Sequence, residues 1–271
     1  MLLTIRHATY YRFSHPAQYT VEYLRLTPRS DFSQQVHKWS VTTPGRTTQQ
    51  IDGFGNILQI LVRDEIHEEN SIVVEGLVES LDTAGVVAPH PAEDHLPREI
   101  FLRPTLLTGP VGAVQDLAAP LGECFATDPL DALHRLSRAV AKAVTYRKGM
   151  TNVESTAAEV LEAGVGVCQD QAHVFAAAAR LLGAPTRYVS GYVHVTGNKA
   201  DESASHAWVE SWVDDLGWVA FDVTNEVCAN DAHVRLAVGT DYLSCAPVRG
   251  IRSGGGEETM SVQVTVATAQ Q

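Results

Sequence analysis

The sequence predicts an α+β fold, in which an N-terminal β-sandwich precedes a domain whose helices pack on an antiparallel sheet. Segments rich in β-branched and aromatic residues, separated by turn signals, fill residues 1–82 and favour short strands. After residue 110, helix signals come first and strand signals follow, which is the order expected of an α+β domain. Proline recurs between the two parts and predicts a linker at 83–110, which leaves 111–271 as the second domain.

Five segments of the N-terminal part have the composition of strands. They are Leu2–Phe13, Thr20–Leu26, Gln35–Thr42, Ile57–Val62 and Ile72–Leu81. Proline- and glycine-containing breaks separate them, the first at Ser14 to Pro16. The histidines of this part are scattered, and we predict no chemical role for them.

The second domain opens with helices whose ends are marked in the sequence. Asp128 is a candidate N-cap, and Pro129 suits the first helical position. Thr156 and Glu159 have the spacing of a capping box, and Gly164 can end the short helix that they begin. This helix is followed by a second glycine, Gly166, and then by Cys168.

Cys168 stands at the predicted start of a helix. Gly164 and Gly166 precede it, an apolar stripe with a three- and four-residue repeat follows, and Gly183 with Pro185 ends the helix. Unpaired amide hydrogens and the helix dipole stabilise a thiolate at such a position, where cysteines titrate at about 3.5–7.5. A free cysteine is usually buried and inert, so this stretch alone leaves both interpretations open.

A predicted hairpin places a histidine beside a carboxylate. Residues 205–213 and 218–222 have the composition of strands, and His206 and Asp222 lie eight residues before and after Asp214 in the turn. A hairpin folded there brings the two side chains together to within about one residue of register. Joined to a thiol at a helix start, they form the arrangement of an activated nucleophile, in which the base takes the thiol proton and the carboxylate orients the base.

Other polar residues near these motifs favour structural roles. Asp170 and His173 share the cysteine helix, and two ligands at a five-residue step do not make a zinc site, so we predict no metal. Trp208 either covers the His–Asp pair or is plain core, and Glu210 is a candidate for a local salt bridge.

Several segments together resemble the bacterial transglutaminase-like cysteine peptidases. They are Gly-Val-Cys-Gln-Asp-Gln-Ala-His (166–173), Tyr-Val-Ser-Gly-Tyr (188–192), Ser-His-Ala-Trp-Val-Glu (205–210) and Gly-Trp-Val-Ala-Phe-Asp-Val-Thr-Asn (217–225). The resemblance extends over nearly the whole chain, including the N-terminal region of that family. It implies a papain-like transglutaminase core with Cys168 as nucleophile, His206 as general base and then acid, and Asp222 as the orienting carboxylate.

The resemblance implies neither calcium nor another cofactor. Val223 departs from the family, which commonly has proline after the triad aspartate. Because Val223 lies beside the carboxylate, we expect this difference to alter the stiffness of the loop more than the chemistry.

Composition restricts the partners. The chain has 271 residues and 45% hydrophobic residues, and its 20 basic against 32 acidic residues give a net charge of −12. A net negative charge argues against nucleic acid and against an anionic membrane as the main partner. Because the sequence shows neither an export signal nor a disulfide pattern among its four cysteines, we expect a cytoplasmic protein.

The motifs predict thiol acyl transfer on a peptide or protein substrate. We expect a hydrolase of peptide or isopeptide bonds that works through a Cys168–His206–Asp222 triad and an acyl-enzyme. One alternative is transglutaminase-type transfer from glutamine to a primary amine, because the same triad serves both reactions. A second alternative is a non-catalytic peptide-binding module, against which the intact set of three residues counts.

Overall fold

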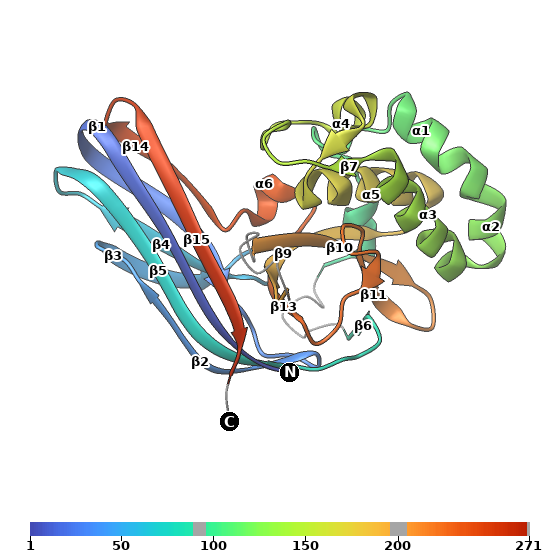
Figure 1. Cartoon of the computed structure of the whole chain (residues 1–271), viewed down its shortest axis with the longest axis horizontal. Helices are drawn as coiled ribbons and strands as arrows, with labels where there is room; N and C mark the ends of the chain where they lie inside the picture. Colours follow the sequence, from blue (N-terminus) through green and yellow to red (C-terminus); the bar gives the residue numbers. More distant parts are fainter. Residues whose placement is uncertain (89–95, 196–204, 270–271) are drawn as a thin grey trace.

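A computed structural model of the chain describes residues 1–88, 96–195 and 205–269. Figure 1 shows three layers: a curved sheet built mainly from the N-terminal region, a second sheet in the middle, and a group of helices on the far side. The mixed α+β class predicted from the sequence is confirmed.

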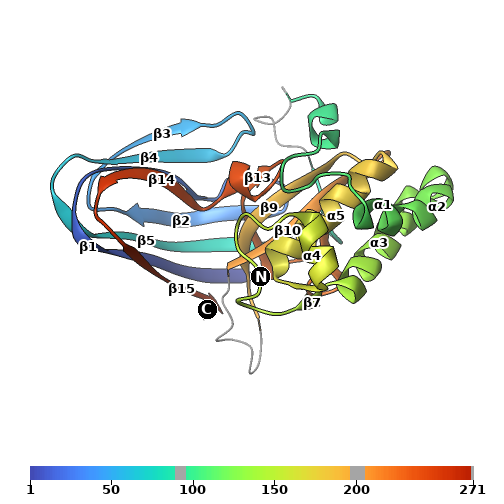
Figure 2. The same cartoon turned by 90° about the horizontal axis from the view of Figure 1, so that it is seen from above.

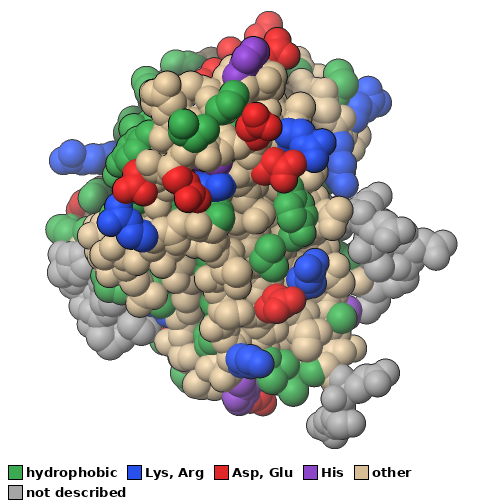
Figure 3. All heavy atoms as spheres, turned by 90° about the vertical axis from the view of Figure 1, so that its left-hand side faces the viewer, with side chains coloured by type: hydrophobic (Ala, Val, Ile, Leu, Met, Phe, Trp, Pro, Cys, Tyr) green, Lys and Arg blue, Asp and Glu red, His purple; other side chains and the backbone are tan. Residues whose placement is uncertain are grey.

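The curved sheet is antiparallel, and β1 is its longest strand. Its strands are β1 (Leu2–Thr27), β2 (Gln34–Thr42), β3 (Arg46–Ile51), β4 (Ile57–Arg63), β5 (His67–Ser80), β14 (Val248–Gly254) and β15 (Glu258–Thr268). The order is β2-β5-β1-β4-β3, and β14 and β15 both pair with β1. Charges of both signs are interspersed with scattered apolar side chains on the side of the molecule shown in Figure 3.

The predicted N-terminal sandwich is not confirmed, because these strands belong to one hydrogen-bonded sheet. The sequence predicted a break at Ser14 to Pro16, but β1 continues through it with only a shift in register against β5. A register shift of this kind bends a strand without ending it. The first half of β1 therefore pairs with β5 and β15, and the second half pairs with β4 and β14.

The C-terminal strands return to the N-terminal sheet. The alternation of Val262, Val264 and Val266 predicted a last strand, and β15 contains it. This strand pairs with residues 3–13 of β1 rather than with the sheet of the second domain. The two ends of the chain thus share one sheet, although the prediction from the sequence placed residues 111–271 in a single separate domain.

The middle sheet is also antiparallel. It contains β6 (Val86–Val87), β9 (Thr186–Val193), β10 (Ser205–Val213), β11 (Gly217–Asp222), β12 (Val227–Cys228) and β13 (His233–Gly239). The order is β12-β11-β10-β9-β13, with β6 added beside β11.

The helices lie on one face of this sheet (Figure 2). They are α1 (Ala113–Ala118), α2 (Gly122–Thr127), α3 (Pro129–Ala143), α4 (Ala157–Ala163) and α5 (Cys168–Leu182), with the short α6 (Tyr242–Cys245) beside β9 and β13. The short strands β7 (Thr145–Tyr146) and β8 (Val165–Gly166) connect them.

The predicted helix ends agree with the structure. The Asp128 side chain accepts a hydrogen bond from the Asp131 amide at 3.0 Å, as an N-cap does. Thr156 and Glu159 form the capping box of α4. Gly183 ends α5 in the left-handed conformation, with φ of 97°.

The middle sheet is buried on both faces. Val209 and Phe221 face the helices, where Phe175 of α5 stacks on Phe221. On the other side, Tyr192 and Val234 pack against the curved sheet in a core of aliphatic side chains. The β9, β11 and β13 strands consequently consist almost entirely of buried residues.

Two side-chain amides attach the curved sheet to strand β13. Gln34 accepts from the amide of Arg235 at 2.8 Å and donates to its carbonyl at 2.9 Å. Asn56 accepts from and donates to Val238 in the same way, with both bonds at 2.8 Å. Each amide takes the hydrogen-bonding place of a neighbouring strand, so the edge of β13 is satisfied by the N-terminal region.

The predicted linker is packed rather than free where it is described. The 3₁₀ helix η2 (Arg98–Leu102) buries Phe101 against Trp218. The carbonyl of Phe101 accepts a hydrogen bond from the buried guanidinium of Arg180 at 3.0 Å. Residues 89–95 of the predicted linker lie outside the described residues. Among the residues that are described, no helix is long and apolar enough to cross a membrane.

Candidate active site

The loop before α5 is tightly held, and it fixes the position of Cys168. Strands β7 and β8 run parallel, and the Asp170 carboxylate accepts hydrogen bonds from the Val167 amide at 2.7 Å and from the Thr151 hydroxyl at 2.6 Å. A Cβ on Gly166 would lie 2.8 Å from Asp170, so the loop requires glycine there. Asp170 thus has the structural role predicted for it.

The hairpin of β10 and β11 brings His206 and Asp222 together. The turn centres one residue later than predicted, because Val213 pairs with Gly217 and Val209 with Phe221. Asp222 therefore lies opposite Trp208 in the hairpin. Because Trp208 is two residues after His206 on β10, His206 and Asp222 are diagonal neighbours on the same face of the sheet. The prediction that the two side chains meet is correct, although they meet diagonally.

The structure brings the three predicted site residues together. His206 Nε2 is 2.8 Å from Asp222 Oδ2, and the Asp222 side chain is fully buried. Cys168, at the start of α5, lies close enough to His206 to help raise the pKa of the imidazole.

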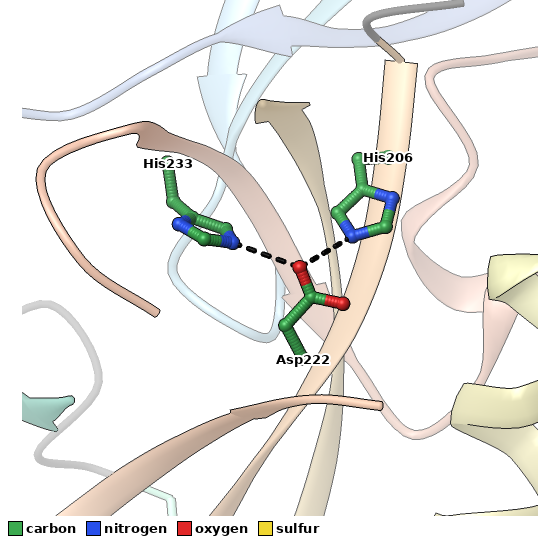
Figure 4. A group of neighbouring side chains, drawn as sticks. All are labelled: His206, Asp222 and His233. Carbon is green, nitrogen blue, oxygen red and sulfur yellow. Dashed lines mark hydrogen bonds and ion pairs between the residues drawn. The ribbon is translucent and has the colours of Figure 1, made fainter. Parts of the chain in front are cut away.

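Two further residues hold Asp222, and the sequence analysis did not identify either of them. His233 Nε2 lies 2.9 Å from Asp222 Oδ2, and Asn225 Nδ2 donates to the same oxygen at 2.6 Å. Figure 4 shows the two imidazole rings on opposite sides of the carboxylate. Asn225 lies within a quoted motif, but His233 begins β13, at the opposite edge of the sheet from β12, and no pattern in the sequence brings it to Asp222.

Burial and hydrogen bonding act in opposite directions on the two central groups. Burial alone would raise the pKa of Asp222, but hydrogen bonds from His206 and His233 outweigh it and lower the pKa far below the usual range. Burial alone would lower the pKa of His206, but the interactions with Asp222 and Cys168 raise it to about 10. The arrangement therefore favours an ionised carboxylate beside an imidazolium.

His206, Asp222 and His233 are also the residues that could hold a metal ion, since their ligand atoms lie within 4.8 Å of one another. However, Asp222 Oδ2 already faces three hydrogen-bond donors, the two imidazole rings and the amide of Asn225. A metal would require both rings to give up those hydrogens. We therefore interpret the cluster as a hydrogen-bonded support for His206.

Trp208 covers this cluster from within the sheet. Its ring centroid is 6.1 Å from that of His206 and 5.3 Å from that of His233, and the side chain is buried. Trp208 therefore shields the His206–Asp222 pair from water, which is one of the two roles predicted for it. Further along β10, Glu210 forms a buried ion pair with Arg187 at 2.5 Å, which is the local salt bridge expected of it.

Comparison with known proteins identifies the family. The profile of the transglutaminase-like superfamily matches residues 119–223, and that of the bacterial transglutaminase-like N-terminal region matches residues 3–79. An uncharacterized protein of Mycobacterium leprae is 31% identical over 279 residues, which cover 97% of this chain and 98% of that protein. An uncharacterized protein of Mycobacterium tuberculosis is 30% identical, covering 91% and 86%.

A solved structure has the same overall fold. A candidate cysteine protease from Cytophaga hutchinsonii superimposes with a TM-score of 0.77, at 21% identity, over 100% of this chain and 91% of that one. The protein-glutamine gamma-glutamyltransferase of Pseudomonas aeruginosa is 28% identical over 123 residues, which cover 42% of this chain and 18% of that protein. The chain belongs to the transglutaminase-like superfamily, and it carries the bacterial N-terminal region of that superfamily.

Proposed function

We propose that the protein is a thiol-dependent hydrolase of peptide or isopeptide bonds. The observation that carries this proposal is the 2.8 Å hydrogen bond between His206 and the buried carboxylate of Asp222, with Cys168 beside His206 at a helix start. Membership of the transglutaminase-like superfamily supports a thiol-dependent enzyme.

In the proposed reaction the Cys168 thiolate attacks the carbonyl carbon of an amide. The resulting oxyanion is stabilised by amide hydrogens at the start of α5, the Cys168 amide among them. His206 gives its proton to the leaving amine as the C–N bond breaks, which leaves a thioester on Cys168. His206 then takes a proton from water, and the hydroxide attacks the thioester, which releases the acid and restores the Cys168 thiolate beside the His206 imidazolium. Asp222 acts through His206 by fixing its orientation and stabilising its cation.

Transfer to a primary amine is the second candidate. It would differ only in the last step, where an amine rather than water attacks the thioester. The similarity to the Pseudomonas aeruginosa gamma-glutamyltransferase, which spans 123 residues, supports amine transfer as the second candidate reaction. A non-catalytic peptide-binding module is the third candidate, and the presence of Cys168, His206 and Asp222 side by side argues against it. The cytoplasmic location and the absence of nucleic-acid and membrane partners remain predictions from the sequence.

The test uses a mixed peptide library with and without an added primary amine, and mass spectrometry of the products. A Cys168→Ala variant is compared with the wild type, and Cys124→Ala serves as a matched control on α2. Cleavage that is lost only in Cys168→Ala and is indifferent to the amine supports the hydrolase. Amine adducts on glutamine that are lost in the same variant identify a transglutaminase instead.

Thiol labelling distinguishes an enzyme from a binding module. Burial raises the pKa of Cys228 and that of Cys245, and desolvation with a hydrogen bond to Asp131 raises the pKa of Cys124. We therefore expect iodoacetamide to modify Cys168 much faster than the other three cysteines at neutral pH. Equal and slow labelling of all four cysteines would contradict the assignment of Cys168 as a nucleophile.

A further inference from the structure

The inner face of the curved sheet changes character along β1. Close to the middle sheet it is aliphatic, with Leu3 and Leu24 fully buried in the shared core. Farther along the same strand, Thr20 and Glu22 are also buried, at 3% and 6% exposure, although they are polar. Neighbouring β5 contributes Asn70, which is 2% exposed. Buried polar groups on the inside of a sheet need an explanation, because burial without full hydrogen bonding destabilises a fold.

A cavity of about 510 Å³ lies over this polar end of the face. It is bounded by both halves of β1, by β14 and β15, and by Tyr242 of α6. Within the described residues β14 and β15 pair with different halves of β1 and not with one another, so the sheet has an opening between them. The volume lies in the range of ordinary ligand sites.

Glu22 lines this cavity without a cation of its own. Its carboxylate accepts one hydrogen bond, from Asn70 Nδ2 at 2.9 Å, and it forms no ion pair with any described residue. The two arginines of the cavity are engaged elsewhere: Arg249 donates to the Leu243 carbonyl, and Arg252 donates to Glu258. Gly250 lies opposite Glu22 in β14 and has no side chain, and a Cβ there would lie 2.8 Å from the Cγ of Glu22.

The walls of the cavity suit a cationic group. Tyr11, Phe13 and Tyr242 give it aromatic faces, which attract cations. The chain already uses one of them in this way, because the guanidinium of Arg252 lies 4.7 Å from the centre of the Phe13 ring while it pairs with Glu258. Glu22 shares the cavity with Tyr11 and Tyr242, which places a carboxylate and aromatic rings in one site.

We propose that this cavity binds a primary ammonium group of a polypeptide, such as a lysine side chain, with Glu22 as its counter-ion. The aromatic walls would contact the apolar stem of the side chain, and Asn70 would hold the carboxylate in place. The net charge of −12 also favours a cationic partner. Tyr242 links the cavity to the candidate active site, since its ring packs on Tyr188 and its amide donates to His173 of α5.

The test measures binding rather than turnover, so it does not depend on the proposed reaction. The full chain with Cys168→Ala is titrated calorimetrically at about pH 8, above the pKa of Glu22, which is about 7. The ligands are acetyl-Ala-Lys-Ala-amide and the same peptide carrying norleucine in place of lysine. We expect saturable binding of the lysine peptide only, and at least about tenfold weaker binding after Glu22→Gln, since a charge-assisted bond is lost. Glu75→Gln, on an exposed ion pair of the same sheet, is the matched control and should bind normally.

A second variant guards against a folding defect in Glu22→Gln. Met260 is exposed and lines the same cavity as Glu22, so Met260→Lys places a tethered ammonium in the cavity and should compete with the peptide. Met260→Gln has a similar length without the charge and should bind like the parent protein. Equal binding of the lysine and norleucine peptides, no saturable binding at all, or unchanged binding in both Glu22→Gln and Met260→Lys would overturn the proposal.

Discussion

Asp222 and Glu22 are both buried carboxyl groups on strands of this protein, but their surroundings give them opposite properties. Asp222 faces His206, His233 and the Asn225 amide, and the hydrogen bonds from the two histidines lower its pKa in spite of burial. Glu22 has one amide donor, so burial dominates and raises its pKa to about 7. The comparison shows that the donors around a carboxyl group, more than its depth, decide whether it is ionised at neutral pH.

The largest effect is expected from removing the charge at Asp222. An Asp222→Asn variant keeps the shape but no longer stabilises the His206 cation, so we expect activity to fall by about 10⁴-fold, as for the equivalent change in serine proteases. The pKa of His206 should fall from about 10 towards its usual value, because the hydrogen bond that raises it is lost. The measurement is the rate of Cys168 alkylation against pH. An unchanged profile would show that Asp222 does not support His206.

A Glu22→Gln variant tests how the buried carboxyl of Glu22 affects the free energy of unfolding. A carboxyl whose folded pKa is raised stabilises the fold fully below its unfolded pKa, and this contribution is lost as pH rises through about 7. Relative to Glu22→Gln, the wild type should therefore lose about 3 kcal/mol of unfolding free energy between about pH 4 and pH 8. Urea unfolding of both proteins measures this difference. A difference independent of pH would mean that Glu22 is ionised throughout.

A smaller effect is expected at His233, which we regard as a positioning residue. His233→Leu removes one charge-assisted hydrogen bond to Asp222, worth about 1.5–3 kcal/mol, so alkylation of Cys168 should slow by about tenfold to a hundredfold. His233→Gln can place an amide hydrogen near the position of Nε2 and should restore most of the rate. If both variants slow equally, and the pH profile does not move, His233 supports only the packing of β13.

Much of the fold could be predicted because the signals are local. The caps at Asp128 and Thr156, the helix that begins at Cys168 and its end at Gly183 each depend on a few neighbouring residues. The hairpin of His206 and Asp222 was predictable for the same reason, since its register follows from a short turn. The family resemblance rests on these same local segments.

The arrangement of the sheets was decided by long-range pairing. No short-range pattern shows that β1 continues past Pro16, or that β14 and β15 return to pair with it from more than two hundred residues away. The predicted sandwich failed for this reason: strand composition identifies strands but not their partners. The same limit applies to Gln34 and Asn56, which the sequence does not distinguish from ordinary surface residues. Their role depends on the hydrogen bonds that they make to β13 in the folded protein.

The sequence by itself determined the position of Cys168 at a helix start and the hairpin that carries the imidazole and the carboxylate, because each follows from residues close together in the chain. Only the tertiary structure decided what surrounds the two buried carboxyl groups. His233 approaches Asp222 from another strand, and Asn70 approaches Glu22 from another strand. The physical reason is that a pKa depends on every donor and charge within a few ångströms, and those neighbours are gathered by packing rather than by sequence order.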